Sequence, residues 1–170
     1  MATNVEVKAV LRDRVGTEAW ATARCRSGPD VLEQEDVFFP CEGARLKLRI
    51  LGPKRGELIR YQRTNVAEVR TSRYQLARTN DPEALREILG TTLGTAGIVR
   101  KTRLLFIVGQ TRVHIDRVEG LGDFLELEVV MRPEQSEQEG KQIAEGLLSE
   151  LGIGKSELLA QAYIDMLKAK

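Results

Sequence analysis

Like charges occupy alternate positions in three segments that otherwise read as β-strands. The pairs are Lys47 and Arg49, Lys101 and Arg103, and Glu126 and Glu128. Because alternate residues of a strand point to the same face, the two members of each pair lie side by side, about 7 Å apart. Basic pairs at this spacing could bind phosphate oxygens. The acidic pair could hold Mg²⁺ or Mn²⁺, which prefer oxygen ligands.

A solvated outer face with cross-strand ion pairs is the simpler interpretation of any one pair, and each ion pair would then contribute about 0.2–1 kcal/mol. A solvated face would mix both signs along a strand, whereas each of these strands carries one sign opposite its apolar residues. Together, the pairs favour strands that turn their charged faces into a polar lumen and pack their apolar faces outward against helices.

The alternation of apolar and polar residues predicts eight strands with inserted helices. The expected strands cover residues 3–12, 31–39, 44–51, 57–63, 66–78, 97–108, 111–119 and 124–131. Helices are expected over residues 15–26 and 134–151. A third is expected to follow the capping sequence at residues 80–83, and a fourth to run from a cap at Ser156 to about residue 167. We therefore predict an α+β fold: a closed, mostly antiparallel eight-stranded β-barrel, or tunnel, with flanking helices, in a single domain over residues 1–170.

The net charge of +1 over 170 residues gives the chain no overall field that would attract nucleic acid or an anionic membrane. Any anion site must therefore be local. Cys25 and Cys41 suit a reducing compartment, and the N-terminus shows neither a signal peptide nor an apolar run that could span a membrane. We expect a cytoplasmic protein whose partner is a small molecule, and the composition indicates no particular oligomeric state.

An ordered set of segments resembles the CYTH superfamily, also called triphosphate tunnel metalloenzymes. Residues 4–8 (NVEVK) resemble its opening E-x-E-x-K signature, and residues 46–49 (LKLR) its LRIR-type strand. Residues 99–103 (VRKTR) resemble its V-x-K-x-R strand, and residues 113–128 (VHIDRVEGLGDFLELE) its aspartate strand, glycine turn and E-x-E strand. The resemblance implies an eight-stranded tunnel that binds a triphosphate lengthwise with Mg²⁺ or Mn²⁺.

The resemblance also implies roles for individual residues. Glu6, Glu126 and Glu128 match carboxylates that hold metal, while Asp116 would point into the lumen and, with Lys8, take part in catalysis. The expected phosphate-binding residues are Lys8, Lys47, Arg49, Lys101 and Arg103. Arg63 and Arg73 are expected to bind phosphate from the middle strands. Asn4 departs from the family pattern, which places a glutamate there. Its amide oxygen could still bind Mg²⁺, but without a negative charge.

Hydrolysis of a triphosphate, either inorganic or organic such as thiamine triphosphate, is the function we expect. One alternative is a class IV adenylyl cyclase that converts ATP to cyclic AMP and diphosphate. Another is a non-catalytic module that binds polyphosphate or nucleotides, which the uncharged Asn4 would suit. An unrelated barrel with an apolar ligand would need an apolar lumen.

Two single residues carry weaker expectations. His114, the only histidine, is expected to be a hydrogen-bonded structural residue, with general acid–base catalysis as the alternative. Trp20 is expected to anchor the packing of the first helix.

Overall fold

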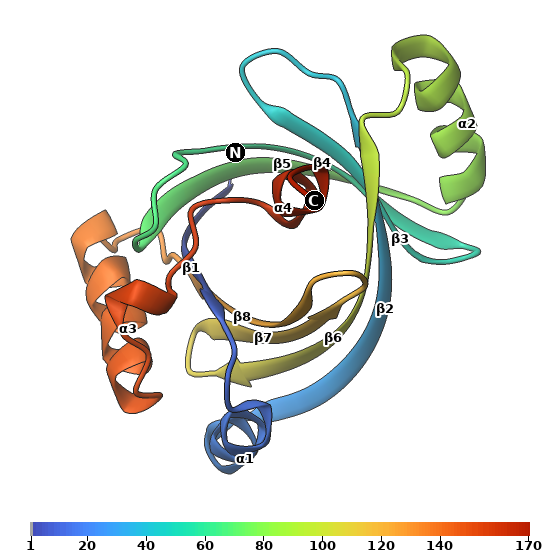
Figure 1. Cartoon of the computed structure of the whole chain (residues 1–170). Coiled ribbons are helices and arrows are strands. Elements are labelled where there is room, and N and C mark those ends of the chain that lie inside the picture. Colours follow the sequence, from blue (N-terminus) through green and yellow to red (C-terminus); the bar gives the residue numbers. More distant parts are fainter. Residues whose placement is uncertain (1) are drawn as a thin grey trace.

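Eight antiparallel strands close into a barrel in the structure of this chain, a computed structural model that describes residues 2–170 (Figure 1). The strands are β1 (Ala2–Val10), β2 (Ser27–Phe39), β3 (Arg45–Gly52), β4 (Arg55–Arg63), β5 (Arg70–Thr79), β6 (Gly97–Val108), β7 (Thr111–Val118) and β8 (Gly122–Val130). Their order around the barrel is β1-β5-β4-β3-β2-β6-β7-β8, and β1 closes it by pairing with both β5 and β8. The predicted fold class is confirmed, although β2 begins earlier and β5 later than the alternation predicts.

The pairing register places the charges of neighbouring strands directly opposite one another. The opposed residues are Glu6 and Glu128, Lys8 and Glu126, Arg49 and Asp36, and Arg103 and Asp116. Because side chains alternate across a strand, these residues share the inner face, while the apolar residues between them face outward. The register therefore sorts polar from apolar side chains between the inside and the outside of the barrel.

Helices α1 (Arg14–Arg24), α2 (Pro82–Leu93) and α3 (Glu137–Glu150) lie outside the barrel (Figure 1). Asp13 and Asp81 cap the first two by accepting hydrogen bonds from backbone N–H groups, and Ser136 caps the third in a capping box. Trp20 packs against the main apolar cluster, as predicted.

That main cluster joins the outer faces of β1 and β8 to helix α3. Val5 and Leu127 are fully buried there and pack with Ala144 of α3. The helix comes so close that a Cβ atom at Gly140 would lie 2.5 Å from Met131 Sδ. The barrel thus has its core on the outside, beneath the helices, which leaves the inner face free for charged side chains. Within residues 2–170, no helix combines the length and the apolar character needed to cross a membrane.

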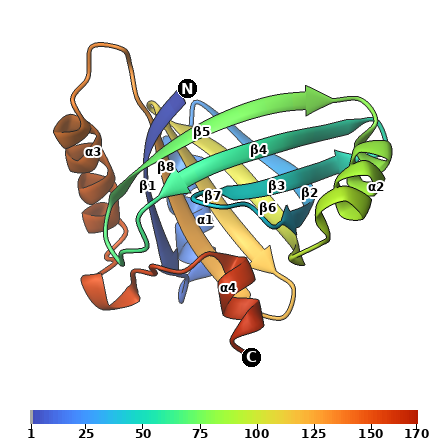
Figure 2. The same cartoon turned by 90° about the horizontal axis from the view of Figure 1, so that it is seen from above.

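The C-terminal segment departs from the prediction of one helix that begins at Ser156. A single 3₁₀ turn (Lys155–Glu157) is followed by extended chain, and helix α4 (Tyr163–Lys168) begins only after Ala162. The extended chain pairs with β1, since the Leu159 N–H donates to the carbonyl of Lys8 at 2.8 Å. Strand pairing competes with the local helical hydrogen bonds here, and it carries the chain across one end of the barrel, where Figure 2 shows α4.

Candidate functional site

A cavity of about 480 Å³ occupies the interior of the barrel. Residues from all eight strands line it, together with Ala162 and Tyr163. Nine of these residues are basic and five are acidic, an excess of four positive charges in a chain whose net charge is +1. The basic residues are Lys8, Lys47, Arg49, Arg55, Arg63, Arg78, Lys101, Arg103 and Arg112, and the acidic ones are Glu6, Asp36, Glu57, Glu126 and Glu128. Seven of the nine cations are buried or partly buried, and only Arg55 and Arg78 are exposed. Buried cations require anions within reach, so this surplus suits a bound polyanion.

The basic pair on β3 is held by a buried aspartate of β2. Lys47 Nζ lies 2.7 Å from Asp36 Oδ2, and Arg49 Nε lies 2.9 Å from Asp36 Oδ1. Burial alone would raise the pKa of Asp36, but the charges of Arg49 and Lys47 hold it well below its usual range. Asp36 is therefore a permanent anion that fixes the direction of both cations and neutralises one of their two charges.

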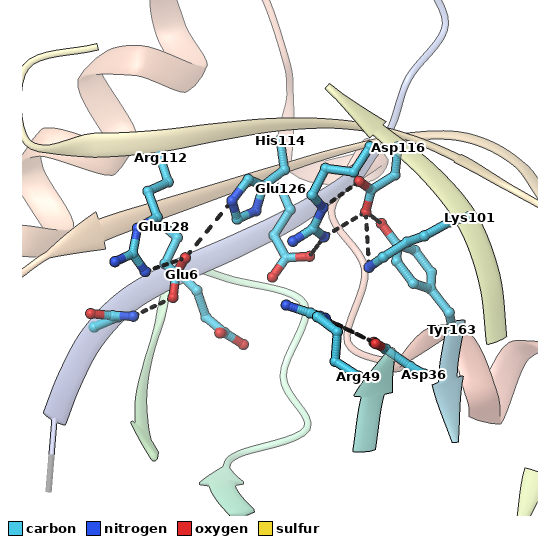
Figure 3. Close-up of polar contacts among 12 residues, drawn as sticks. Glu6, Asp36, Arg49, Lys101, Arg112, His114, Asp116, Glu126, Glu128 and Tyr163 are labelled. Carbon is cyan, nitrogen blue, oxygen red and sulfur yellow. Dashed lines mark hydrogen bonds and ion pairs between the residues drawn. The ribbon is translucent and has the colours of Figure 1, made fainter. Parts of the chain in front are cut away.

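The basic pair on β6 is held in the same way by Asp116 of β7. Arg103 donates hydrogen bonds of 2.6 and 2.7 Å to its two oxygens. Lys101 Nζ lies 3.4 Å from Asp116 Oδ2 (Figure 3). Asp116 is 0% exposed and does not line the cavity. Burial would raise its pKa, but Arg103 and Lys101 lower it below the usual range. An ionised carboxylate with both oxygens engaged positions its partners and is a poor base.

Tyr163, which the sequence reading did not select, contacts this second cluster. Its hydroxyl donates to Asp116 Oδ2 at 2.8 Å. The ammonium groups of Lys8 and Lys101 lie 3.9 and 4.9 Å from the centre of its ring. Cations over an aromatic face are stabilised by the ring quadrupole, so Tyr163 supports two lysines and one carboxylate at the end of the cavity where the C-terminal segment crosses.

Burial lowers the pKa values of both lysines. For Lys101, burial and then the charge of Arg103 bring the pKa to about 7. For Lys8 burial is the main cause, and Glu126 opposes it. Within residues 2–170, Lys8 has no carboxylate oxygen within ion-pair distance, so its ammonium is available to an anion in the cavity.

The three glutamates lie together on β1 and β8, and each is paired with arginine. Glu6 Oε1 lies 3.1 Å from Arg63 and 3.3 Å from Arg70. Glu126 lies 3.2 Å from Arg103, and Glu128 lies 3.2 Å from Arg112. The Asn4 side-chain amide donates to Glu128. Asn4 therefore acts as a donor to a carboxylate at the position where the family pattern supplies another carboxylate.

The three glutamates are also close enough to repel one another. Burial and the charge of Glu126 raise the pKa of Glu6. Burial and the charge of Glu126 also raise the pKa of Glu128, although Arg112 opposes this shift. Burial would likewise raise the pKa of Glu126, but Lys8 and Arg103 hold it well below its usual range. This mutual repulsion is what a divalent cation relieves, and the oxygen donors are those that Mg²⁺ and Mn²⁺ prefer.

No group of three or more His, Cys, Asp or Glu side chains in residues 2–170 is already arranged as a metal cage. Mg²⁺ commonly binds through only one or two carboxylates together with waters and substrate phosphates. The donor set therefore fits a divalent ion that enters with a phosphate ligand. The residues that could hold it are Glu6, Glu126 and Glu128.

His114 differs from its expected role as a hydrogen-bonded residue. It is 5% exposed and lines the cavity, and its Nδ1 atom has no hydrogen-bond partner within residues 2–170. Its Nε2 atom lies 3.9 Å from Glu128 Oε2. Burial and the charge of Arg103 lower its pKa well below the usual value, so His114 is a neutral imidazole in the lumen.

Ten of the eleven residues selected from the sequence lie at the cavity or against its wall, and Arg73 does not. Arg73 is exposed, because the inward residues of β5 are its neighbours Ser72 and Tyr74. The expected register of this strand was wrong by one residue. Arg70 and Arg112 bind two of the glutamates and are not among the predicted site residues. The alternation of Arg112 with Val113 and Ile115 could have indicated it, whereas β5 offers no consistent apolar side that would indicate Arg70.

The comparisons with known proteins agree with this geometry. The family model described as the CYTH domain matches residues 2–163. A protein of Pyrococcus horikoshii OT3 superposes with a TM-score of 0.82 at 22% identity, covering 95% of this chain and 98% of that chain. An adenylate cyclase candidate from Vibrio parahaemolyticus gives 0.75 at 16% identity over 98% of both chains. An adenylyl cyclase candidate from Hippeastrum, described as having a dominant triphosphatase activity, gives 0.63 at 15% identity over 95% of this chain and 91% of that chain. No curated protein matches the sequence.

Proposed function

Since the chain belongs to the CYTH domain family, we propose that its tunnel binds a triphosphate and hydrolyses it with the help of a divalent metal ion. The observation that carries the proposal is the surplus of four positive charges among the residues that line a cavity of about 480 Å³. A single phosphate cannot reach cations on opposite walls, whereas a chain of three phosphates contacts several at once. The triphosphatase activity described for the Hippeastrum protein supports hydrolysis as the reaction.

In the proposed reaction water attacks the terminal phosphorus and the bridging P–O bond breaks, giving orthophosphate and the shortened diphosphate or its ester. The protein contributes position and charge, which dominate phosphoryl transfer. Lys8, Lys101 and Arg103 bind oxygens near the closed end, while Lys47 and Arg49 bind them from β3, on the other side of β2. A divalent ion held by Glu6, Glu126 and Glu128 would neutralise charge on the phosphate oxygens.

Asp116 and Asp36 act as positioning residues in this proposal. Both carboxylates stay ionised beside arginine, so neither is suited to take the proton from water. Their value is that the guanidinium groups already point into the cavity before the ligand arrives. Arginine held in this way presents its remaining N–H groups to phosphate oxygens without a further loss of side-chain entropy.

The test is a substrate panel with metal titration. Purified protein is incubated with Mg²⁺ or Mn²⁺ and separately with inorganic triphosphate, thiamine triphosphate and ATP, and the products are identified. We expect orthophosphate release that requires the metal. Cyclic AMP as the main product from ATP would instead favour a cyclase, and tight binding of all three without turnover would favour a binding module.

The matched variants are Glu126→Gln and Glu87→Gln. Glu126 lies among the proposed metal ligands, whereas Glu87 is exposed on α2. We expect Glu126→Gln to lower metal-dependent kcat/KM by about 100–1,000-fold, the scale of losing one preorganised electrostatic contact, and Glu87→Gln to leave it unchanged. Circular dichroism checks that both variants keep the fold. Full turnover in folded Glu126→Gln would reject the metal assignment.

A further inference from the structure

Four leucines lie in the wall of this charged cavity without a partner in the core. Leu32, Leu51, Leu76 and Leu105 come from β2, β3, β5 and β6 and all line the cavity. None belongs to the three apolar clusters formed within residues 2–170. Leu76 is 42% exposed. Leu32, Leu51 and Leu105 are partly buried. Folding therefore leaves part of the apolar surface of these side chains facing the cavity.

The residues next to these leucines on the same strands show that only the inward-facing leucines lie outside the apolar clusters. Ile50 and Leu104 precede Leu51 and Leu105 in the chain, point outward and pack against apolar clusters. Strands β3 and β6 thus supply apolar residues to the core on one face and a single leucine to the lumen on the other. The leucines are not required to complete the core.

The leucines occupy a defined place along the tunnel. On β3 the inward residues run Lys47, Arg49, Leu51, and on β6 they run Lys101, Arg103, Leu105. Both strands are antiparallel to β2 and therefore run in the same direction as each other. Lys101 lies beside Tyr163 at the closed end. Each basic strand therefore presents ammonium, guanidinium and then leucine with increasing distance from Tyr163.

The leucines form an apolar band beyond the phosphate-binding cations. Further out, the same cavity is lined by Arg55, Glu57 and Arg78 near the turn between β3 and β4. Phosphate oxygens gain nothing from contact with leucine, whereas methylene or ring carbons are stabilised there because both apolar surfaces leave water. A volume of about 480 Å³ lies in the range of pockets that hold organic ligands.

We propose that the ligand is a triphosphate monoester whose organic group lies within this leucine band. Its terminal phosphate points towards Lys8 and Tyr163, and its ester end points towards the open mouth. The inference rests on the proposed function, because it presupposes a triphosphate in the cation-lined part of the tunnel. It adds the chemical class of the head group and the direction in which the ligand lies.

The test uses methylene-bridged triphosphate, which cannot be hydrolysed at its bridges, and its methyl and butyl monoesters. Affinities are measured by calorimetry in the presence of Mg²⁺. Each fully buried methylene can tighten binding by up to about fourfold. We expect the butyl ester to bind at least about tenfold more tightly than the methyl ester, since the band encloses the chain only in part.

The matched variants are Leu32→Ser and Val31→Ser. The two residues are adjacent on β2 and face opposite sides, and Val31 is 63% exposed. Leu32→Ser is expected to remove most of the preference for butyl and to change the affinity for unesterified methylene-bridged triphosphate by less than about twofold. Val31→Ser is expected to change neither. Leu76→Ser, at a half-exposed position, provides the same test if Leu32→Ser fails to fold.

The outcomes separate the two proposals. If the unesterified analogue does not bind, the proposed function fails and the head-group inference fails with it. If that analogue binds but affinity does not rise from methyl to butyl, only the head-group inference is overturned. An equal loss for all three ligands in the leucine variants also overturns it, because the leucines would then be structural.

Discussion

At the scale of single residues, Asp36 is the least expected feature of the tunnel. It lies opposite Arg49 in the β2–β3 ladder, just as Asp116 lies opposite Arg103 in the β6–β7 ladder. Each aspartate thus organises one Lys-x-Arg pair. Two equivalent clusters flank β2 and could bind neighbouring parts of one ligand, with each cluster contributing one net positive charge.

Replacing Asp36 separates its structural role from its effect on the ligand. Asp36→Asn leaves Lys47 and Arg49 side by side without an anion, and we expect a loss of about 1–3 kcal/mol in unfolding free energy at pH 7. This is below the usual loss for a fully buried ion pair, because the cavity admits solvent. Sulfate or triphosphate should restore more stability to this variant than to the wild type, since either anion replaces the missing charge.

Urea unfolding with and without triphosphate measures both effects, and Asp30→Asn is the matched control. Asp30 lies exposed on the same strand, and its change should stay within about 0.5 kcal/mol. The stabilising effect of Asp36 persists above the usual aspartate pKa and is lost as pH falls through its lowered folded pKa. Equal stability of Asp36→Asn and wild type at pH 7 would contradict the role assigned to this carboxylate.

Lys101 should make ligand affinity depend on pH near neutrality. Its pKa is lowered to about 7, mainly by burial and then by Arg103. Below that pH the ammonium is charged and attracts phosphate. Above that pH the amine is neutral, and it must take up a proton before it can attract the phosphate. We expect triphosphate to bind roughly ten- to twentyfold more weakly at pH 8.5 than at pH 7, since each unit above the pKa costs up to tenfold.

Six ionisable groups around Lys101 keep their charge in this window. The pKa values of Asp116 and Asp36 are lowered, those of Arg103, Arg49 and Tyr163 are raised, and that of nearby His114 is lowered. Lys101→Arg is the control, because its guanidinium stays charged and the titration of the ligand itself is common to both proteins. Calorimetry should give a flatter pH profile for Lys101→Arg. Parallel profiles would exclude Lys101 as the titrating group.

The sequence predicted the charged pairs better than their partners. Alternation alone placed Lys47, Arg49, Lys101 and Arg103 on inner faces, because one side of each strand was uniformly apolar. The sequence pattern does not indicate Asp36, because it follows two acidic residues and a glutamine, a run without clear alternation. Arg73 was assigned to the wrong face because β5 lacks a consistent apolar side, and a shift of one residue reverses every side chain.

At the scale of elements, the C-terminal segment determines which end of the tunnel is closed. Arg70 binds the carbonyl groups of Val66, Leu159 and Ala160 through one nitrogen, at 2.6, 3.2 and 3.3 Å. Together with the pairing to β1, these contacts hold the segment against the barrel and direct Tyr163 inward. The contacts with Leu159 and Ala160 join residues 89 and 90 positions apart, so local capping and periodicity could not have predicted them.

Tyr163→Phe tests whether this segment positions the cluster around Asp116. The change keeps the ring beneath Lys8 and Lys101 but removes the hydrogen bond to a fully buried carboxylate. We expect a loss of about 1.5–3 kcal/mol in unfolding free energy, the usual range for a hydrogen bond to a charged group. Because Arg103 would then be held less firmly, kcat should fall more than KM rises.

Tyr61→Phe is the matched control for this change. Tyr61 also lines the cavity, but within residues 2–170 its hydroxyl makes no hydrogen bond to another side chain or to the backbone, unlike that of Tyr163. Stability is measured by chemical denaturation and turnover by phosphate release. Equal, small effects of the two substitutions would show that the Tyr163 hydroxyl has no positioning role.

At the scale of the whole molecule, the barrel separates two kinds of surface. Its apolar residues form the core outside the strands, beneath helices such as α3, and its charged residues converge inside. The eight strands and their closure were predictable because apolar and charged residues alternate along the sequence of each strand. The excess of four positive charges in the cavity was not, because it depends on which strands become neighbours and how far each is offset.

This excess predicts that polyanions stabilise the whole barrel. Free of ligand, like charges on opposite walls repel one another, and a single chain of phosphates that spans the lumen relieves several repulsions together. At a concentration 100 times its Kd, a ligand adds about 2.7 kcal/mol to the unfolding free energy. For a chain of 170 residues, we therefore expect triphosphate to raise Tm by about 5–10 °C.

Orthophosphate and sulfate at matched ionic strength provide the comparison, and differential scanning calorimetry provides the measurement. Each of these ions can satisfy one cluster of cations but cannot bridge the walls, so we expect a rise of less than about 2 °C. Added sodium chloride should reduce the triphosphate effect only in part, because screening acts weakly on charges inside a closed lumen. If orthophosphate at equal ionic strength raised Tm as much as triphosphate, the charges would act as separate sites, and the tunnel would have no preference for a connected chain of phosphates.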